Sequence, residues 1–226
     1  MNKRVKVQHF SDVLCVWAFI AQRRVDELKQ QFGEKVELDY HFVSVFPHAH
    51  QKIAMNWEGR GGMRGYARHV QDVAEGFDFV NIHPDIWIRS SPRSSLPAHL
   101  FLSAVRLCDD KSIDAQGNTL FERAALEVRR AFFSRCEDIS SATVLNAIAE
   151  ELDLPRSLMD KMLENGEAFA RLSEEFALAQ SLGVRSSPTL IFNEGRQILS
   201  GNVGYRVIEA NIQELLRAPA AQLSWC

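Results

Sequence analysis

One cysteine stands at a position where a thiol can do chemistry. Cys15 follows a short alternating segment that ends at Phe10, and it directly precedes a long run of residues with helical spacing. At the head of a helix, free backbone N–H groups and the helix dipole favour a thiolate over a thiol. We therefore expect Cys15 to be nucleophilic near neutral pH. The alternative is a buried structural cysteine, because free cysteines are among the most buried residues.

A proline at the start of a predicted strand is the second feature. Pro188 follows a helix that is expected to end at Gly183, and it begins the apolar run 189–193. A trans proline is compatible with the first residue of a strand. The sharper interpretation is a cis Ser187-Pro188 bond that faces Cys15. Because cis bonds are rare even before proline, the position alone does not decide between the two.

The other three cysteines offer no clear partner for Cys15. All four are too far apart in the sequence for a disulfide scaffold or a CxxC zinc site. Cys108 and Cys136 lie on or beside apolar helical faces, which favours a packing role. Cys226 is interpreted as an exposed, incidental thiol, and a role in resolving a mixed disulfide is the alternative.

The histidines predict neither a metal site nor a Cys–His pair. His48 and His50 are two residues apart in a predicted loop, and no second pair follows at ligand spacing. Nothing in the sequence orders these two, His69 or His99 around Cys15 as a general base would require. We therefore expect no metal cofactor.

The composition excludes several classes of function. The chain has 226 residues, enough to fold without disulfide staples, and a net charge of -3. Its arginines are scattered, so no basic surface for nucleic acid or an anionic membrane is expected. We find no export signal and no stretch of roughly 20 apolar residues that would span a membrane. We expect a cytoplasmic protein with reduced cysteines.

The two ends of the chain predict α/β architecture. Alternation of apolar and polar residues indicates strands at 4–10 and 35–45, and helical spacing indicates a helix at 16–32, closed by Gly33. Such a strand, helix, strand unit is a right-handed crossover with parallel strands. Near the other end, segments 189–193 and 196–200 predict an antiparallel hairpin, followed by a helix at 205–217.

The middle of the chain predicts a helical insertion. Glycines and prolines break the periodicity from 47 to 94, so we expect a loop-rich segment there. Helices are expected at 96–109, 118–135, 140–153 and 155–182, the last divided at Asn165-Gly166. The predicted organisation is therefore an α/β domain of residues 1–46 and 183–226, with a helical subdomain of residues 47–182 inserted in it.

Several of these segments together resemble the DsbA-type thioredoxin-like family. The segments are Ser11-Asp12-Val13-Leu14-Cys15-Val16-Trp17-Ala18, the helical stretch 137–154, Gly183 to Thr189, and Ser200-Gly201-Asn202. The resemblance implies a thioredoxin-like fold (βαβ, insertion, ββα) in which Cys15 is the attacking sulfur. It also implies that Ser187 and cis-Pro188 form a groove for an extended substrate, with Trp17 over the sulfur or in the groove.

The chain departs from this family at one decisive position. Where the family usually has CxxC, this sequence has Cys15-Val16-Trp17-Ala18, so a dithiol cycle within the motif is impossible. Release of a mixed disulfide then needs another thiol. We expect glutathione or a separate protein to supply it. The leading hypothesis is a monothiol, glutathione-linked thiol-disulfide oxidoreductase that acts on a small-molecule or protein disulfide.

A related branch supplies the main alternative. Kappa-class glutathione transferases and 2-hydroxychromene-2-carboxylate isomerases share the inserted helices and bind glutathione, but generally have serine at the position of Cys15. The resemblance implies that glutathione would contact Ser187, Pro188, Gly201 and Asn202. The segments with Arg185 and Tyr205-Arg206 offer charge for a carboxylate of the ligand, and the alternative is that these side chains are solvated surface residues. Trp57 and Trp87 belong to the insertion, which would form one wall of the cleft. Two other functions stay open: a glutathione-dependent transferase or isomerase for small aromatic compounds, and a redox-inactive binding module. A homodimer also stays open.

Overall fold

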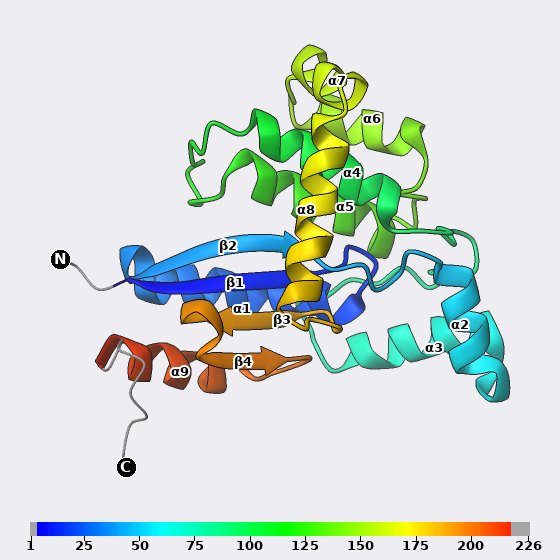
Figure 1. Ribbon diagram of the computed structural model, residues 1–226. Coiled ribbons are helices and arrows are strands. Elements are labelled where there is room, and N and C mark those ends of the chain that lie inside the picture. The colour runs from blue at the N-terminus through cyan, green and yellow to red at the C-terminus, as the bar shows by residue number, and fades with distance from the viewer. Residues whose placement is uncertain (1–3, 218–226) are drawn as a thin grey trace.

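The computed structural model describes residues 4–217, so Cys226 lies outside the described residues. Four strands form one sheet in the order β2-β1-β3-β4 (Figure 1). Strand β1 (Val5–Ser11) pairs in parallel with β2 (Val36–Phe42) and antiparallel with β3 (Thr189–Phe192), which pairs antiparallel with β4 (Gln197–Ser200). Segments from the two ends of the chain therefore share the sheet. The α/β, thioredoxin-like fold class is confirmed.

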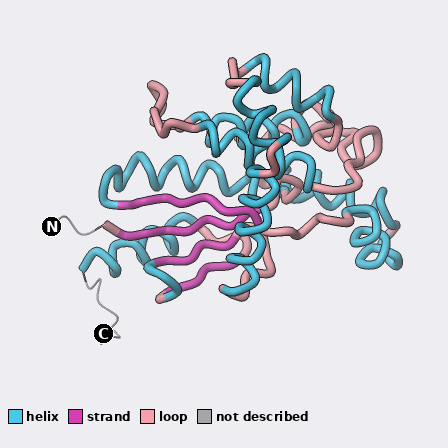
Figure 2. Tube along the Cα trace, turned by 45° about the horizontal axis from the view of Figure 1, so that its top comes forward, coloured by secondary structure: helices cyan, strands magenta, loops and turns pink. Residues whose placement is uncertain are grey.

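Helices cover both faces of this sheet. Helices α1 (Val16–Phe32) and α9 (Tyr205–Arg217) pack on one face, where Val7, Leu28 and Ile212 meet in one apolar cluster. Helix α8 (Glu167–Ser181) packs on the other face, where Ala179 meets Phe10. Figure 2 shows the sheet between these layers. Helix α1 has the predicted bounds because its apolar residues recur at helical spacing and Gly33 caps it by donating its N–H to the Lys29 carbonyl oxygen.

The insertion is more helical than the sequence predicted. Helices α2 (Ala49–Trp57) and α3 (Gly62–Glu75) occupy the first part of the segment that we expected to be rich in loops, where that expectation is wrong. Residues 76–95 form no helix or strand, as expected. Gly61, with φ 86°, begins α3 in the left-handed conformation. A Cβ on Gly65 would lie 1.7 Å from the Arg60 carbonyl oxygen, so the turn before α3 packs directly on this glycine. The glycines serve helix packing here.

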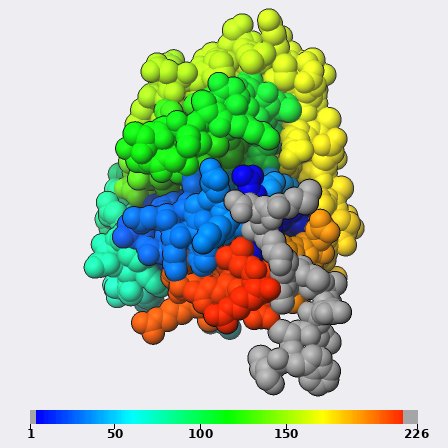
Figure 3. All heavy atoms as spheres, turned by 90° about the vertical axis from the view of Figure 1, so that its left-hand side faces the viewer, coloured from blue at the N-terminus to red at the C-terminus, as the bar shows by residue number. Residues whose placement is uncertain are grey.

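The remaining helices of the insertion follow the predicted order. They are α4 (Leu96–Cys108), α5 (Leu120–Phe133), α6 (Ala142–Glu151), α7 (Arg156–Glu164) and α8. The predicted division before α8 falls at Gly166, with φ 85°. Seen from the end at which β1 begins, the green and yellow helices lie above the sheet and α9 lies below it (Figure 3). No helix within residues 4–217 is long and apolar enough to cross a membrane.

Candidate active site

Cys15 lies where β1 turns into α1. It is the N-cap residue of α1, and its backbone N–H donates to the Asp12 carbonyl oxygen at 3.1 Å. Its thiol donates to the carbonyl oxygen of Ser187 at 3.0 Å, and the Ser187-Pro188 bond is cis. The fold thus brings together two residues that are 172 positions apart, in the arrangement that the family resemblance implied. The side chain is almost enclosed, since only 7% of Cys15 is exposed.

Asp12 holds the loops around the thiol in place. Its carboxylate is fully buried and accepts four hydrogen bonds. The donors, at 2.9 to 3.0 Å, are the backbone N–H groups of Leu14, Val45 and Phe46 and the hydroxyl of Ser95. The backbone N–H of Asp12 also donates to Ser187 Oγ at 2.9 Å. This one residue therefore ties the end of β1, the segment after β2 and the cis-proline loop together.

The pKa of Cys15 shifts in the direction opposite to the one that the helix head alone predicted. Burial raises the pKa of the Cys15 thiol, and the negative charge of Asp12 raises it further. A hydrogen bond with the side chain of Ser187 lowers this pKa, and so do the backbone N–H groups of Ala18 and Trp17, as the position at the helix head predicted. Burial outweighs these hydrogen bonds in this enclosed state.

Two helices that the sequence did not predict bring side chains to this site. Lys52 of α2 donates to the Val45 carbonyl oxygen at 2.9 Å. Burial lowers the pKa of Lys52, although the nearby Asp12 and Cys15 act to raise it. Tyr66 of α3 is within electrostatic reach of the same two residues, and burial is the main reason that its pKa is raised. No local motif marks either residue, because the helices that carry them lie in the glycine-rich segment.

His99 lies beneath the site as a hydrogen-bond acceptor. It is fully buried in α4, and its Nε2 accepts the backbone N–H of Val13 at 3.3 Å. Burial lowers the pKa of His99, although Asp12, 3.8 Å from Nε2, raises it. Since its Nε2 faces Val13, His99 supports the turn before Cys15. Within residues 4–217, no histidine hydrogen-bonds to Cys15 itself.

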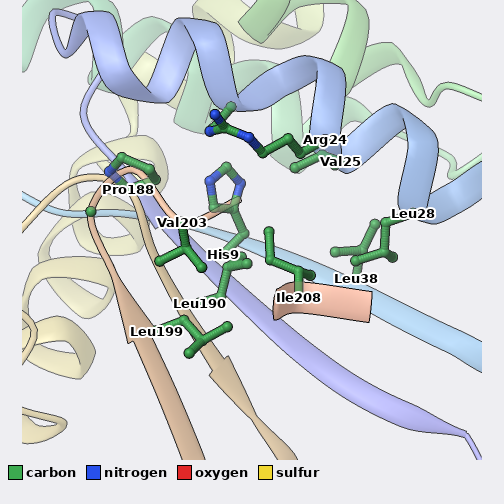
Figure 4. Close-up of a pocket in the computed structure, with 12 residues that line it drawn as sticks. His9, Arg24, Val25, Leu28, Leu38, Pro188, Leu190, Leu199, Val203 and Ile208 are labelled. Carbon is green, nitrogen blue, oxygen red and sulfur yellow. The ribbon is translucent and has the colours of Figure 1, made fainter. Parts of the chain in front are cut away.

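The residues predicted to bind glutathione surround Pro188. The Gly201 N–H donates to the Pro188 carbonyl oxygen at 2.8 Å, and Asn202 is exposed beside it. Figure 4 shows a pocket between α1 and the sheet that Pro188 and Gly201 help to line, together with His9 and apolar side chains. Its volume of about 20 Å³ is enough for roughly one water molecule. The structure thus brings Ser187, Pro188, Gly201 and Asn202 to one edge of the site.

The three tryptophans within residues 4–217 have different surroundings. Trp17 is half-buried and packs edge-on against Phe77, with ring centres 6.4 Å apart. Trp57, the last residue of α2, is half-buried and packs against Tyr66 at 5.5 Å. Trp87 is fully buried and packs within the apolar core of the insertion.

The predicted carboxylate-binding residues are separated. Arg185 is exposed and lines a cleft of about 290 Å³ between α8 and the segment that follows β2. The hydroxyl of Tyr205 donates to Gln31 of α1, and Arg206 is exposed. Arg185 therefore has a cavity beside it, whereas Tyr205 has a structural partner.

The remaining described cysteines are free thiols. Cys136 is buried and donates to the Asp85 carbonyl oxygen at 3.4 Å, while Cys108 is half-buried at the end of α4. These surroundings agree with packing roles. Among residues 4–217, no group of three His, Cys, Asp or Glu side chains is placed to hold a metal ion.

Comparison with known proteins identifies the family. Residues 6–213 match the sequence profile of the DSBA-like thioredoxin domain. The chain belongs to the DsbA-like thioredoxin family. A search among curated proteins finds no match.

Solved structures of DsbA-like proteins and related enzymes share the fold. The 2-hydroxychromene-2-carboxylate isomerase is 17% identical, with 97% of this chain and 100% of that chain covered and a TM-score of 0.64. The cytosolic disulfide reductase DsbM from Pseudomonas aeruginosa, solved with GSH, is 14% identical, with 94% and 96% covered and a TM-score of 0.62. The thiol-disulfide exchange protein alpha-DsbA2 from Wolbachia pipientis is 15% identical, with 95% and 83% covered and a TM-score of 0.55.

Proposed function

We propose that this protein is a monothiol thiol-disulfide oxidoreductase that acts through Cys15 with glutathione as cosubstrate. The observation that carries the proposal is the 3.0 Å hydrogen bond from Cys15 Sγ to the carbonyl oxygen of Ser187, directly before cis-Pro188. It places the sulfur beside the backbone that leads into β3, with which we expect a peptide-like ligand to pair. Ala18 stands where a second cysteine would be, so the motif offers one sulfur only.

Exchange through one thiol takes two steps. In the first, the Cys15 thiolate attacks the glutathione sulfur of a glutathionylated thiol. A disulfide forms between Cys15 and glutathione, and the old disulfide breaks with its electron pair on the departing thiolate, which takes up a proton. In the second, the thiolate of another glutathione attacks the glutathione sulfur of this mixed disulfide. Oxidised glutathione leaves, and Cys15 is released as a thiolate.

The surroundings of Cys15 favour an external thiol for the second step. Cys136 is buried against the Asp85 carbonyl oxygen, and Cys108 lies at the far end of α4 from His99 and the site. Glutathione is a small peptide, and its cysteine backbone would pair with Ser187 while its γ-glutamyl end reaches Gly201 and Asn202. The similar structure of DsbM, named a cytosolic disulfide reductase and solved with GSH, supports this cosubstrate and a cytoplasmic location.

Replacement of Cys15 tests the proposal. We expect Cys15→Ser to abolish reduction of a glutathionylated peptide by glutathione, because serine cannot form the mixed disulfide. The assay is the release of oxidised glutathione, coupled to glutathione reductase and NADPH. Cys108→Ser is the matched control and should retain the wild-type rate, since Cys108 does not contact Ser187. Full activity of Cys15→Ser would show that the proposed chemistry is wrong.

A glutathione-dependent isomerase or transferase is the second candidate. Tyr66 and Trp57 pack together on the insertion, and both rings lie against the apolar core that includes Cys15. Such a pair of rings suits a small aromatic substrate, and the isomerase with this fold supports the idea. This function predicts turnover of such a substrate that survives Cys15→Ser and is lost in Trp57→Ala. If neither activity occurs and glutathione does not bind, the protein is a redox-inactive binding module.

A further inference from the structure

A cleft of about 290 Å³ opens beside the cis-proline loop and has no role in the exchange reaction described so far. It lies between the end of α8 and the segment that follows β2. Three buried apolar side chains line it, those of Val43, Ala179 and Val184, and all three belong to the apolar cluster beneath α8. The half-buried ring of Phe176 also lines it. The cleft therefore offers an apolar surface to a ligand.

The lining of this cleft carries one positive charge and no negative one. Ser44 and Arg185 are exposed where they line it, and none of the lining residues is acidic. Within residues 4–217, no carboxylate lies within 4.0 Å of the Arg185 guanidinium. Arg171, on α8, instead has Glu175 at 2.6 Å. Since a guanidinium can bind a carboxylate through two parallel hydrogen bonds, Arg185 suits an anionic group of a ligand.

The cleft and the predicted glutathione-binding residues lie on opposite sides of the thiol. Strands β1 and β2 end at one edge of the sheet, where β3 begins and β4 ends. In the order of the strands, this edge carries Ser44, Cys15, Ser187 and Gly201. The small pocket that Gly201 lines lies between α1 and the sheet (Figure 4), whereas the cleft lies on the face that α8 covers. A ligand held at Gly201 therefore leaves the cleft free.

Arg185 is close enough to the thiol to bind a group attached to the reacting disulfide. Consecutive Cα atoms are about 3.8 Å apart across a trans peptide, so the Cα atoms of Arg185 and Ser187 are at most about 7.6 Å apart. The Ser187 carbonyl oxygen accepts the Cys15 thiol at 3.0 Å. Asp12 fixes both sides of the cleft to this loop, because it accepts the N–H of Val45 and donates its own N–H to Ser187 Oγ, each at 2.9 Å.

We propose that this cleft binds the protein half of a glutathionylated substrate and selects a segment with an apolar and an acidic side chain beside the modified cysteine. The proposal rests on the proposed exchange reaction of Cys15. When the Cys15 thiolate attacks the glutathione sulfur, glutathione stays on Cys15. The protein thiolate leaves with the electron pair of the broken bond and takes up a proton. The cleft holds this leaving half, with its apolar side chain against Val43 and Val184 and its carboxylate on Arg185.

The size and the charge of the cleft set the kind of segment that it selects. Its volume is close to the lower limit of about 300 Å³ for small-molecule pockets, so it takes one or two side chains of an extended segment. A lysine or arginine at the position of the acidic side chain would face the like charge of Arg185, which lowers affinity. The cleft therefore distinguishes acidic from basic segments.

Paired peptides test this preference. Each peptide carries a glutathionylated cysteine, a neighbouring leucine and then either a glutamate or a lysine, and both directions along the peptide are used. In the wild type we expect kcat/KM to be about tenfold higher for the glutamate peptide. Arg185→Glu should reverse the preference, and Arg185→Gln should remove most of it. Arg4→Glu is the matched control: it makes the same change of charge at an exposed arginine before β1, at the other end of the sheet, and should keep the preference.

A small substrate separates this role from the exchange chemistry. The mixed disulfide of glutathione and 2-mercaptoethanol has no peptide segment, so Arg185→Glu should reduce it at the wild-type rate. Ser44→Trp, which places a large ring in the cleft, should slow the glutamate peptide and leave this small substrate unaffected. Equal loss of both activities in either variant overturns the proposal, because it would mean that the residue serves the reaction itself.

Binding of the same peptides with serine in place of the modified cysteine needs no thiol chemistry. Fluorescence anisotropy should show tighter binding of the glutamate peptide to the wild type and of the lysine peptide to Arg185→Glu. Equal affinities of the two peptides, or a preference that Arg185→Glu does not change, overturn the proposal. A preference that reverses in Arg185→Glu, in a protein that shows no glutathione turnover, contradicts the proposed exchange reaction and leaves the charge selectivity of the cleft in place.

Discussion

Asp12→Asn should weaken the fold and make the thiol more acidic at the same time. The substitution keeps the shape of the side chain but replaces one carboxylate oxygen by an NH₂ group. If the NH₂ group occupies the position of Oδ2, it faces the N–H groups of Val45 and Phe46, which lose their acceptor. If it occupies the position of Oδ1, it faces the N–H of Leu14, and three charge-assisted hydrogen bonds become neutral ones.

The magnitude follows from these contacts. A buried donor left without an acceptor costs about 1–3 kcal/mol, and a hydrogen bond to a charged group is about twice as strong as a neutral one. Either orientation of the amide therefore reduces the free energy of unfolding by about 2–5 kcal/mol. Ser95→Ala, which removes a single donor to the same carboxylate, should cost only about 1–2 kcal/mol.

Two assays follow the two effects of Asp12→Asn. Urea unfolding gives the loss of stability, and alkylation against pH gives the thiol pKa. Because the negative charge of Asp12 raises the pKa of Cys15, its removal should lower that pKa. A loss of stability below 1 kcal/mol, or a thiol pKa that stays constant or rises, would refute the account of Asp12 as the charged centre of these loops.

Two other perturbations test separate parts of the structure. Burial alone would lower the pKa of His41, but hydrogen bonds with Asp39 and Glu175 raise it above its usual value. The protonated form of His41 therefore stabilises the fold fully below about pH 6.5, and this stabilisation is lost as the pH rises through the raised pKa. As the pH rises from about 6.5 through the raised pKa of His41, the free energy of unfolding should therefore fall in the wild type and not in His41→Gln. The same dependence of unfolding free energy on pH in both proteins, measured by urea unfolding, would contradict this. Ala18→Cys restores the missing second sulfur, so it should release a Cys15 mixed disulfide without added glutathione, as followed by mass spectrometry. A mixed disulfide that persists in Ala18→Cys would show that the geometry of the 15–18 turn does not support a dithiol cycle.

Local sequence patterns predicted the elements that lie against the sheet. Helix α1 and the β3-β4 hairpin have regular apolar spacing and a clear glycine signal at their ends, and both formed where expected. The segment around Gly61 and Gly65 was misjudged because glycine is usually a helix breaker, whereas here it permits a close approach of backbone to backbone. Whether a glycine interrupts a helix or allows it to pack depends on contacts that are not local.

The candidate site was predictable only in part for the same reason. Cys15 and Ser187 were brought together by resemblance to a family, and no local pattern would have paired them. Lys52 and Tyr66 come from two helices of the insertion, and their spacing in the sequence carries no sign of a shared site. The expected lowering of the Cys15 pKa rests on the N–H groups at the helix head, whereas the cost of burial, which outweighs them, depends on the packing of the whole insertion.

The most direct test of the central claim is mass spectrometry of the protein after brief reaction with a glutathionylated peptide, quenched with acid. Exchange through a single thiol predicts one glutathionyl group per chain, located on Cys15 by peptide mapping and removed by glutathione with formation of one oxidised glutathione. A protein that releases the peptide without ever carrying glutathione on Cys15, or that carries it on Cys108 or Cys136 instead, would contradict the claim.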